Sequence, residues 1–148
     1  MTDAGVCIGI DCGDARIGVA VSDALGVLAR PLTTVPAQPQ KAALAELADL
    51  ARRHCAVCVI LGLPIRADGE EGTAAAKARA FAALLLPLLP QGVGIHFQDE
   101  FRSTMTAAGY LRAKGQKGRD QRKSIDQTAA AVILQEWLDT RQPPPGAA

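Results

Sequence analysis

Apolar residues of this chain are grouped in short runs that alternate with turn residues. Residues 6–11 and 17–22 are rich in Ile and Val and lie on either side of a turn at Gly13, a pattern that predicts an antiparallel hairpin. Residues 28–35 predict a third strand. Pro31 places that strand near an edge of the sheet, because proline has no N–H to donate to a neighbouring strand.

The rest of the chain alternates between helical and extended patterns. In order, it predicts a helix over 41–54, a strand over 55–63 that is buried on both faces, a helix capped by Thr73 and ended by Pro87, a strand over 93–100, a helix over 103–113, and a last helix over 124–139 that is capped by Ser124. Three antiparallel strands followed by β-α units predict an α/β fold with one five-stranded mixed sheet, its later strands added in parallel and its faces flanked by helices.

The length of 148 residues suits a single domain, which we expect over residues 1–141, followed by a disordered Pro-rich tail over 142–148. The longest apolar runs, 56–65 and 81–90, are too short to cross a bilayer, and residues 1–5 lack a secretory signal. We therefore expect a cytoplasmic protein with no membrane partner.

Four cysteines are present, and Cys55 and Cys58 have the spacing of a CxxC motif. Residues three apart on a strand point to opposite faces, so these two thiols are not expected to bind one metal ion together. The expectation is free thiols in a reducing compartment.

Charge is distributed unevenly although the net charge is only +1. Residues 102–123 contain seven basic residues and one acidic residue, and they include an expected mobile basic loop over 114–122. Such a segment is either a solvated loop or a contact for a polyanion such as nucleic acid. The basic residues are Arg102, Arg112, Lys114, Lys117, Arg119, Arg122 and Lys123.

Acidic residues stand at the ends of predicted elements. Asp11 ends the first strand, Asp99 and Glu100 end the fifth, and Asp126 opens the last helix. Strand ends and helix starts can meet at one edge of a sheet, where carboxylates would repel one another unless a cation lay among them. Mg²⁺ or Mn²⁺ is the cation that such an all-oxygen site prefers.

Structural explanations for two of these acids remain open. Asp11 could cap the turn before Gly13, and Asp126 could be stabilised by the helix dipole. Asp126 also precedes an apolar stripe formed by Ala130 and Ile133, which favours an orientation toward the sheet.

Strand alternation separates the two acids of the fifth strand. Glu100 shares a face with His96 and Gln98, whereas Asp99 shares a face with the apolar residues of the strand. Glu100 is therefore preferred over Asp99 as a site residue. His96 is more readily explained as a strand histidine with its hydrogen bonds satisfied than as a general base.

Five groups of residues carry a family resemblance. They are Gly9-Ile10-Asp11-Cys12-Gly13 with residues 16–23; Gly62-Leu63-Pro64 with Asp68-Gly69 and Glu71-Gly72; Asp99-Glu100 with Ser103-Thr104; Ser124-Ile125-Asp126; and Ala129-Ala130. In this combination and order, the chain resembles the YqgF-type (RuvX-type) pre-16S rRNA nuclease family. The resemblance implies an RNase H-like fold and a metal-dependent endonuclease for structured nucleic acid. It also implies a role in ribosome biogenesis, in which the 5′ end of precursor 16S rRNA is trimmed.

The resemblance also implies a set of site residues. Asp11, Glu100 and Asp126 fall on the family's catalytic, metal-binding acids, with Asp99 the less favoured member of the strand-five pair. Arg16, together with the basic residues of 102–123, is expected to contact nucleic acid. The chain departs from the family pattern after the acidic pair, where Phe101 precedes Arg102 instead of an arginine following directly.

Other functions compatible with the residues also make distinct predictions. A Holliday junction resolvase would act on branched DNA and normally needs a two-fold dimer. A non-catalytic RNase H-like module would bind nucleic acid without turnover. A phosphate-binding fold like that of sugar kinases would need a second such domain. Structured RNA and a ribosomal precursor particle are the expected partners, and both a monomer and a homodimer remain open.

Overall fold

The computed structural model describes residues 5–66, 68–100 and 118–141, with backbone only for 118–127. Within these residues, five strands form one sheet in the order β3-β2-β1-β4-β5. The strands are β1 (Cys7–Cys12), β2 (Arg16–Ser22), β3 (Ala29–Pro36), β4 (Cys58–Pro64) and β5 (Gly94–Glu100). β1, β2 and β3 are antiparallel, and β4 and β5 extend the sheet in parallel to β1, as the sequence predicted.

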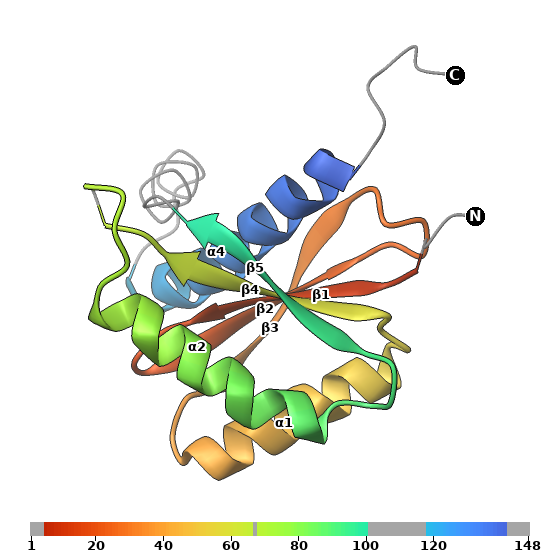
Figure 1. Ribbon diagram of the computed structural model, residues 1–148, viewed down its shortest axis with the longest axis horizontal. Coiled ribbons are helices and arrows are strands. Elements are labelled where there is room, and N and C mark those ends of the chain that lie inside the picture. The colour runs from red at the N-terminus through yellow and green to blue at the C-terminus, as the bar shows by residue number, and fades with distance from the viewer. Residues whose placement is uncertain (1–4, 67, 101–117, 142–148) are drawn as a thin grey trace.

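Helices cover both faces of the sheet. The helices α1 (Gln40–Arg53) and α2 (Thr73–Leu85) pack on one face, and a short 3₁₀ turn, η1 (Leu86–Leu88), follows α2. The long helix α4 (Gly118–Arg141) crosses the other face (Figure 1). The predicted helix over 103–113 and the predicted tail over 142–148 lie outside the described residues. No helix in the described ranges is long and apolar enough to pass through a bilayer.

Two hydrophobic clusters result from the alternation of side chains along the strands. Ile8 and Ile10 of β1 are fully buried against the layer of α1 and α2. Cys7 of β1 and Ile60 of β4 point the other way and are buried under α4, where Leu134 packs on them. The side-chain direction of each β1 residue therefore decides which helix layer it contacts. Asp11 has the same direction as Cys7 and Gly9 and so faces α4.

Gly9 sets the height of α4 above the sheet. A β-carbon on Gly9 would lie 2.7 Å from Cβ of Leu134 and 3.0 Å from the carbonyl oxygen of Ala130. The helix therefore rests almost directly on the β1 backbone. This close approach places the middle of α4 next to the strand that ends in Asp11.

The predicted strand over 55–63 begins three residues too early. Cys55 has a φ of 53°, and it follows the last turn of α1 as a left-handed residue. The N–H of Cys55 donates to the carbonyl of Arg52 (3.1 Å), and the N–H of Ala56 donates to that of Ala51 (2.9 Å). This pair of bonds is a Schellman motif, which ends the helix and delays the strand to Cys58.

Two helix starts also differ from the prediction. Gly72, not Thr73, is the N-cap of α2, and no side-chain capping bond is formed there. The last helix begins at Gly118 and not at Ser124, so the backbone over 118–122 is helical where a loop was predicted. Apart from Gly118, that stretch consists of Arg, Asp and Gln, whose propensity allows the helix to extend back from its packed region.

Candidate active site

The carboxyl ends of three parallel strands meet at one edge of the sheet. β1, β4 and β5 run in the same direction, so Asp11, Pro64 and Glu100 lie at the same end (Figure 1). Pro64 is directly paired with Glu100, and Ile10 is paired with Leu61. Two acids predicted as site residues, Asp11 and Glu100, therefore stand one strand apart at this edge.

Both acids face the α4 layer. Gly9 lies under α4, and Asp11, two residues further along β1, has the same orientation. On β5, the His96 ring contacts the Trp137 ring of α4, with 5.4 Å between centroids. Glu100 lies four residues after His96 and so shares its face.

Gly62 provides space for the Glu100 carboxylate. Gly62 lies on β4, the strand between β1 and β5, and its missing side chain would point toward α4. A β-carbon there would lie 3.1 Å from Oε2 of Glu100 and 2.6 Å from Cδ1 of Ile133. The Glu100 side chain thus leans across β4, toward the strand that carries Asp11.

The Cys12 thiol responds to the charge of both carboxylates. Burial is the main reason that the pKa of Cys12 is raised to about 12, and the negative charges of Asp11 and Glu100 raise it further. Both carboxylates therefore lie close enough to Cys12 for their charges to act on its thiol.

Asp99 lies on the opposite face, near α2. The charge of Asp99 acts on Arg79 of α2. The pKa of Arg79 is raised mainly by hydrogen bonds to Glu71 and to a lesser degree by the charge of Asp99. The Arg79 guanidinium donates to both carboxylate oxygens of Glu71, at 2.8 and 2.7 Å, and lies 5.0 Å from the centre of the Phe97 ring. The alternation predicted for β5 is confirmed, and it separates Asp99 from Asp11 and Glu100.

The backbone of Asp126 is helical, but the helix begins eight residues earlier than this position. The prediction that Asp126 opens the last helix is therefore wrong, and with it the explanation that a helix N-terminus stabilises this acid. Asp126 precedes Ala130 by one helical turn, and the carbonyl of Ala130 lies over Gly9. The side chain of Asp126 lies outside the described residues.

The predicted basic contacts are described only in part. Arg16 is the first residue of β2, and its carbonyl accepts a hydrogen bond from the N–H of Gly13 (2.9 Å). A β-carbon on Gly13 would lie 2.6 Å from that carbonyl oxygen, so the turn after Asp11 requires glycine. The side chains of the other predicted basic residues lie outside the described residues: Arg102, Arg112, Lys114, Lys117, Arg119, Arg122 and Lys123.

Sequence reasoning missed the part that Gly62 plays in the site. A lone glycine inside a strongly apolar strand is a signal for close approach of another group, and Gly62 interrupts such a run. The identity of that group could not be read from the sequence, because Glu100 is 38 positions away along the chain.

Carboxylate oxygens are suitable ligands for Mg²⁺ or Mn²⁺, and the two acids of this edge supply them. No cluster of three or more His, Cys, Asp or Glu residues placed to bind a metal occurs in the part of the chain that is described. The further acid predicted for the site, Asp126, has its side chain outside that part.

Comparison with known proteins identifies the family. The family model described as "RuvX: Holliday junction resolvase" matches residues 5–140. The chain belongs to this family.

Curated relatives agree with the RuvX assignment. Proteins named "Putative pre-16S rRNA nuclease" are similar along nearly the whole chain. The protein from Anaeromyxobacter dehalogenans (strain 2CP-C) is 44% identical over 136 residues, which cover 92% of this chain and 98% of the relative. The protein from Nocardia farcinica is 46% identical over 140 residues, which cover 90% of this chain and 77% of the relative.

Solved structures of resolvases share the fold of this RuvX-family chain. Thermus thermophilus RuvC in complex with a Holliday junction substrate superposes with a TM-score of 0.55 at 19% identity, covering 93% of this chain and 95% of RuvC. The fowlpox virus resolvase in complex with Holliday junction DNA gives a TM-score of 0.58 at 10% identity, covering 93% and 99%. The predicted RNase H-like fold is thereby confirmed, and the family confirms the predicted class of enzyme, a nuclease that cleaves phosphodiester bonds.

Proposed function

We propose that this RuvX-family chain is a divalent-metal-dependent endonuclease that trims the 5′ end of precursor 16S rRNA. Asp11, Glu100 and Asp126 are the proposed catalytic acids. One observation carries the proposal: Asp11 and Glu100, which are 89 positions apart in sequence, lie at the same edge and on the same face of the sheet. The names of the curated relatives supply the substrate.

The two carboxylates have the chemistry of a cation site. Asp11 and Glu100 are half-buried, so they retain contact with water while their mutual repulsion is only partly screened. A divalent ion held between them would remove that repulsion. Mg²⁺ or Mn²⁺ bound by these acids would lower the pKa of a water molecule and stabilise the leaving oxygen of the phosphodiester.

Each remaining residue has a proposed part in binding or positioning. Gly62 keeps the space over β4 open, so that the Glu100 carboxylate can lie over β4, the strand next to β1. Arg16 starts the strand after the Asp11 turn and is proposed to contact a phosphate near the cut. The basic residues of 102–123 supply the positive charge that a polyanionic backbone requires.

The test is a cleavage assay on RNA that carries the 5′ leader of precursor 16S rRNA, as free RNA and within a ribosomal precursor particle. Wild-type protein with Mg²⁺ or Mn²⁺ should cut the leader, and chelation by EDTA should stop the reaction. Asp11→Asn should reduce the rate about 100-fold or more, because it removes one negative ligand without changing shape. Circular dichroism and urea unfolding of the variant check that its fold is kept.

A second substrate, a four-way DNA junction, separates the two activities that the comparisons name. The family description and the fold of the resolvases favour this DNA substrate as the alternative. Faster cutting of the junction than of the leader RNA, by a protein that sediments as a dimer, would favour the resolvase function. Salt-sensitive binding without metal-dependent cutting of either substrate would reject both and leave a binding module.

A further inference from the structure

Trp137, the one tryptophan of the chain, has an aromatic and a cationic neighbour on the surface. Its ring centroid lies 5.4 Å from that of His96, with 35° between the ring planes. Cζ of the Arg141 guanidinium lies 4.4 Å from the centre of the same ring. Together, His96, Trp137 and Arg141 form a group that we call the Trp137 stack.

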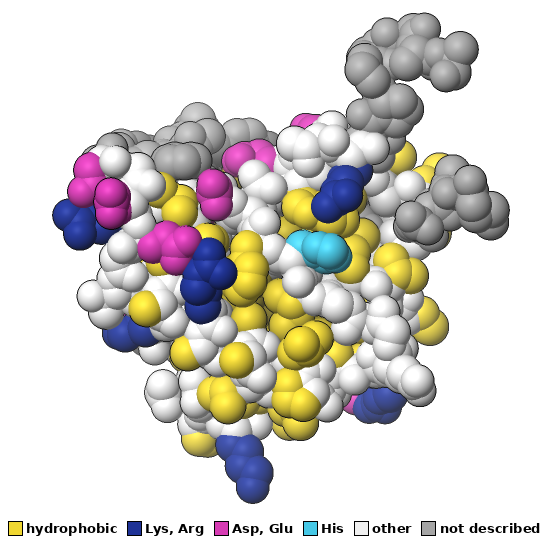
Figure 2. Space-filling model, in the orientation of Figure 1, with side chains coloured by type: hydrophobic (Ala, Val, Ile, Leu, Met, Phe, Trp, Pro, Cys, Tyr) yellow, Lys and Arg dark blue, Asp and Glu magenta, His cyan; other side chains and the backbone are white. Residues whose placement is uncertain are grey.

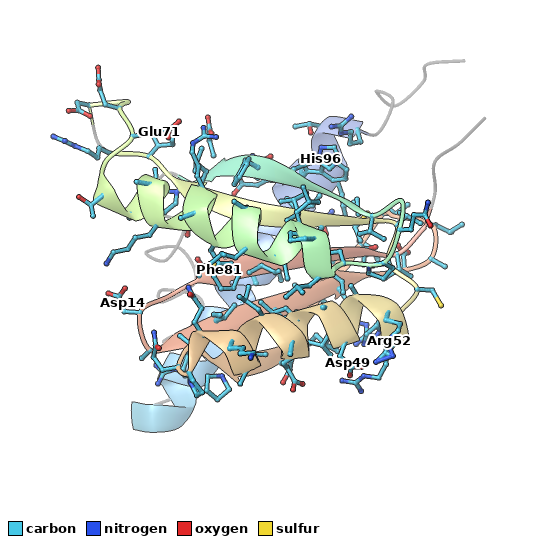
Figure 3. The ribbon with its side chains drawn as sticks, turned by 60° about the horizontal axis from the view of Figure 1, so that its bottom comes forward. Asp14, Asp49, Arg52, Glu71, Phe81 and His96 are labelled. Atoms are coloured by element: carbon cyan, nitrogen blue, oxygen red, sulfur yellow. The ribbon has the colours of Figure 1, made fainter. Side chains whose placement is uncertain are left out.

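The sheet holds the Trp137 stack in place while its polar members remain in solvent. Trp137 is half-buried and packs on the cluster under α4 that contains Ile60 and Leu134. His96 and Arg141 are exposed. Figure 2 shows a histidine and a basic side chain on either side of a hydrophobic patch on this face, and Figure 3 places His96 beside the end of α4.

The stack lies on the same face of β5 as the proposed active site. His96, Gln98 and Glu100 alternate along β5, and all three side chains point to the α4 side. At about 3.3 Å per residue, the four steps from His96 to Glu100 span about 13 Å. β5 ends the sheet within the described residues, so this path follows an edge strand. A strand of nucleic acid with a phosphate at Glu100 could reach the Trp137 stack.

We propose that the Trp137 stack binds an unpaired base of the RNA substrate, about 13 Å along β5 from the cleavage site. This inference rests on the proposed nuclease function and adds to it a requirement for single-stranded RNA at that distance from the cut. Aromatic rings bind bases of any sequence by stacking, and the Arg141 guanidinium, which lies over the Trp137 ring, offers a base a further planar group to stack on. Half-burial fixes the indole, so little side-chain freedom remains to be lost when a base binds.

The surroundings favour a nucleic acid over a protein partner. The large exposed apolar side chains of the described residues lie elsewhere, in the turn before β3, before β4, and on α2 and η1. Asp139, an acid on the same helix, accepts a hydrogen bond from Gln135, which in turn contacts the turn before β3. The stack itself is aromatic and cationic, which is the combination that stacked bases and phosphates match.

The single tryptophan allows a direct test with the wild-type protein. An oligouridylate is titrated in EDTA, so that binding is measured without cleavage, and the intrinsic fluorescence of Trp137 is followed. We expect saturable quenching by the oligonucleotide and none by inorganic polyphosphate, which carries charge but no bases. Unchanged fluorescence at saturating oligonucleotide, with binding verified by anisotropy of a labelled strand, would overturn the proposal.

Variants test the same point by anisotropy. Trp137→Ala should weaken binding about tenfold, and Trp137→Phe should retain most of the affinity because it keeps an aromatic ring. Leu84→Ala, which changes an exposed side chain on α2, is the matched control and should have no effect. Equal affinities for Trp137→Ala and wild type would overturn the proposal.

Two exposed members of the stack, His96 and Arg141, provide variants that avoid the core if Trp137→Ala fails to fold. His96→Ala and Arg141→Ala should each weaken binding severalfold, and wild-type affinity in both would also overturn the proposal.

The result is independent of the nuclease test. Asp11→Asn should quench like wild type while it fails to cleave. If the wild type cleaves but shows no quenching, the stack proposal fails alone. If quenching occurs without cleavage of any substrate, the nuclease function fails and base binding stands.

Discussion

Oε2 of Glu100 lies 3.1 Å from the point that a β-carbon of residue 62 would occupy. The glutamate ends β5, and Gly62 lies on the neighbouring parallel strand β4. The absence of a side chain at one position therefore determines where the carboxylate at another can rest. This relationship makes the geometry of the proposed site sensitive to a single methyl group.

Gly62→Ala is expected to damage the site more than the fold. The new methyl group would meet Glu100 and the Cδ1 of Ile133, at 2.6 Å, so one or both side chains must move. Overpacking of this kind costs about 1–3 kcal/mol of unfolding free energy, and a carboxylate displaced by about 1 Å can lower the cleavage rate by about 100-fold. Urea unfolding and the leader-RNA assay measure the two effects.

Gly94→Ala is the matched control, because a β-carbon on Gly94, also in a parallel strand, has no neighbour within 4 Å. Its cleavage rate should stay close to that of the wild type. A Gly62→Ala protein that cleaves at the wild-type rate would show that the position of Glu100 is not set by β4.

The two adjacent acids of β5 should differ in their effect on cleavage. Glu100→Gln removes a charge on the face of Asp11, whereas Asp99→Asn removes one on the face of Arg79. We expect a loss of about 100-fold or more in the first variant and less than about threefold in the second. The measurement is the cleavage rate of each variant and of wild type on the leader RNA at saturating Mg²⁺ or Mn²⁺. A larger loss of cleavage rate in Asp99→Asn than in Glu100→Gln would mean that Asp99, and not Glu100, is the catalytic acid of β5.

Asp23 should make the stability of the β2–β3 turn dependent on pH. The carboxylate accepts hydrogen bonds from the N–H of Val27 (2.8 Å) and of Leu28 (3.3 Å), and the first is the main cause that lowers the pKa of Asp23. A lowered pKa in the folded state means that the stabilisation is present above about pH 4 and disappears as the pH falls through the folded value.

Asp23→Ala should therefore have a lower Tm than wild type near neutral pH, and the difference should close in acid. Thermal unfolding of both proteins between about pH 7 and pH 2.5 measures it. A difference that stays constant over this range would mean that the charge of Asp23 contributes nothing to the turn.

Cys55→Gly is expected to stabilise the protein. Cys55 has a φ of 53°, a left-handed conformation that costs a residue with a β-carbon about 1 kcal/mol and costs glycine almost nothing. The midpoint of urea unfolding should rise accordingly. Cys55→Ala keeps the β-carbon and the penalty, so it should match wild type. A rise of equal size in both variants would attribute the gain to loss of the exposed thiol instead.

The sequence was sufficient for the parts of the fold that depend on local pattern. The Gly13 hairpin, the alternation along β5 and the buried β4 all follow from which residues are apolar, because strand periodicity decides the face of each side chain. The preference for Glu100 over Asp99 rested on that periodicity alone, and the two acids do lie on opposite faces.

Other features depend on partners that are distant in sequence or on weak local signals. The end of α1 was predicted to within one residue, but the Schellman motif that delays β4 to Cys58 could not be foreseen, because glycine and not cysteine is its usual residue. The start of α4 was misplaced because a glycine-rich basic segment resembles a loop until packing further along supports the helix. The Trp137 stack required knowledge that β5 and the end of α4 are neighbours.

The chain enters β1 at Cys7 and leaves α4 at Arg141, and both positions lie at the end of the sheet away from Asp11 and Glu100 (Figure 1). The charge of Arg141 is felt by the Cys7 and Cys58 thiols, which places the end of the helix over the beginning of the strands. Attachment to a sensor surface through the amino end would therefore present the acidic edge outward. A carboxyl-terminal anchor would also present the acids outward but would crowd Arg141, so this choice of end would hinder access of a bound RNA to the Trp137 stack and not to the acids.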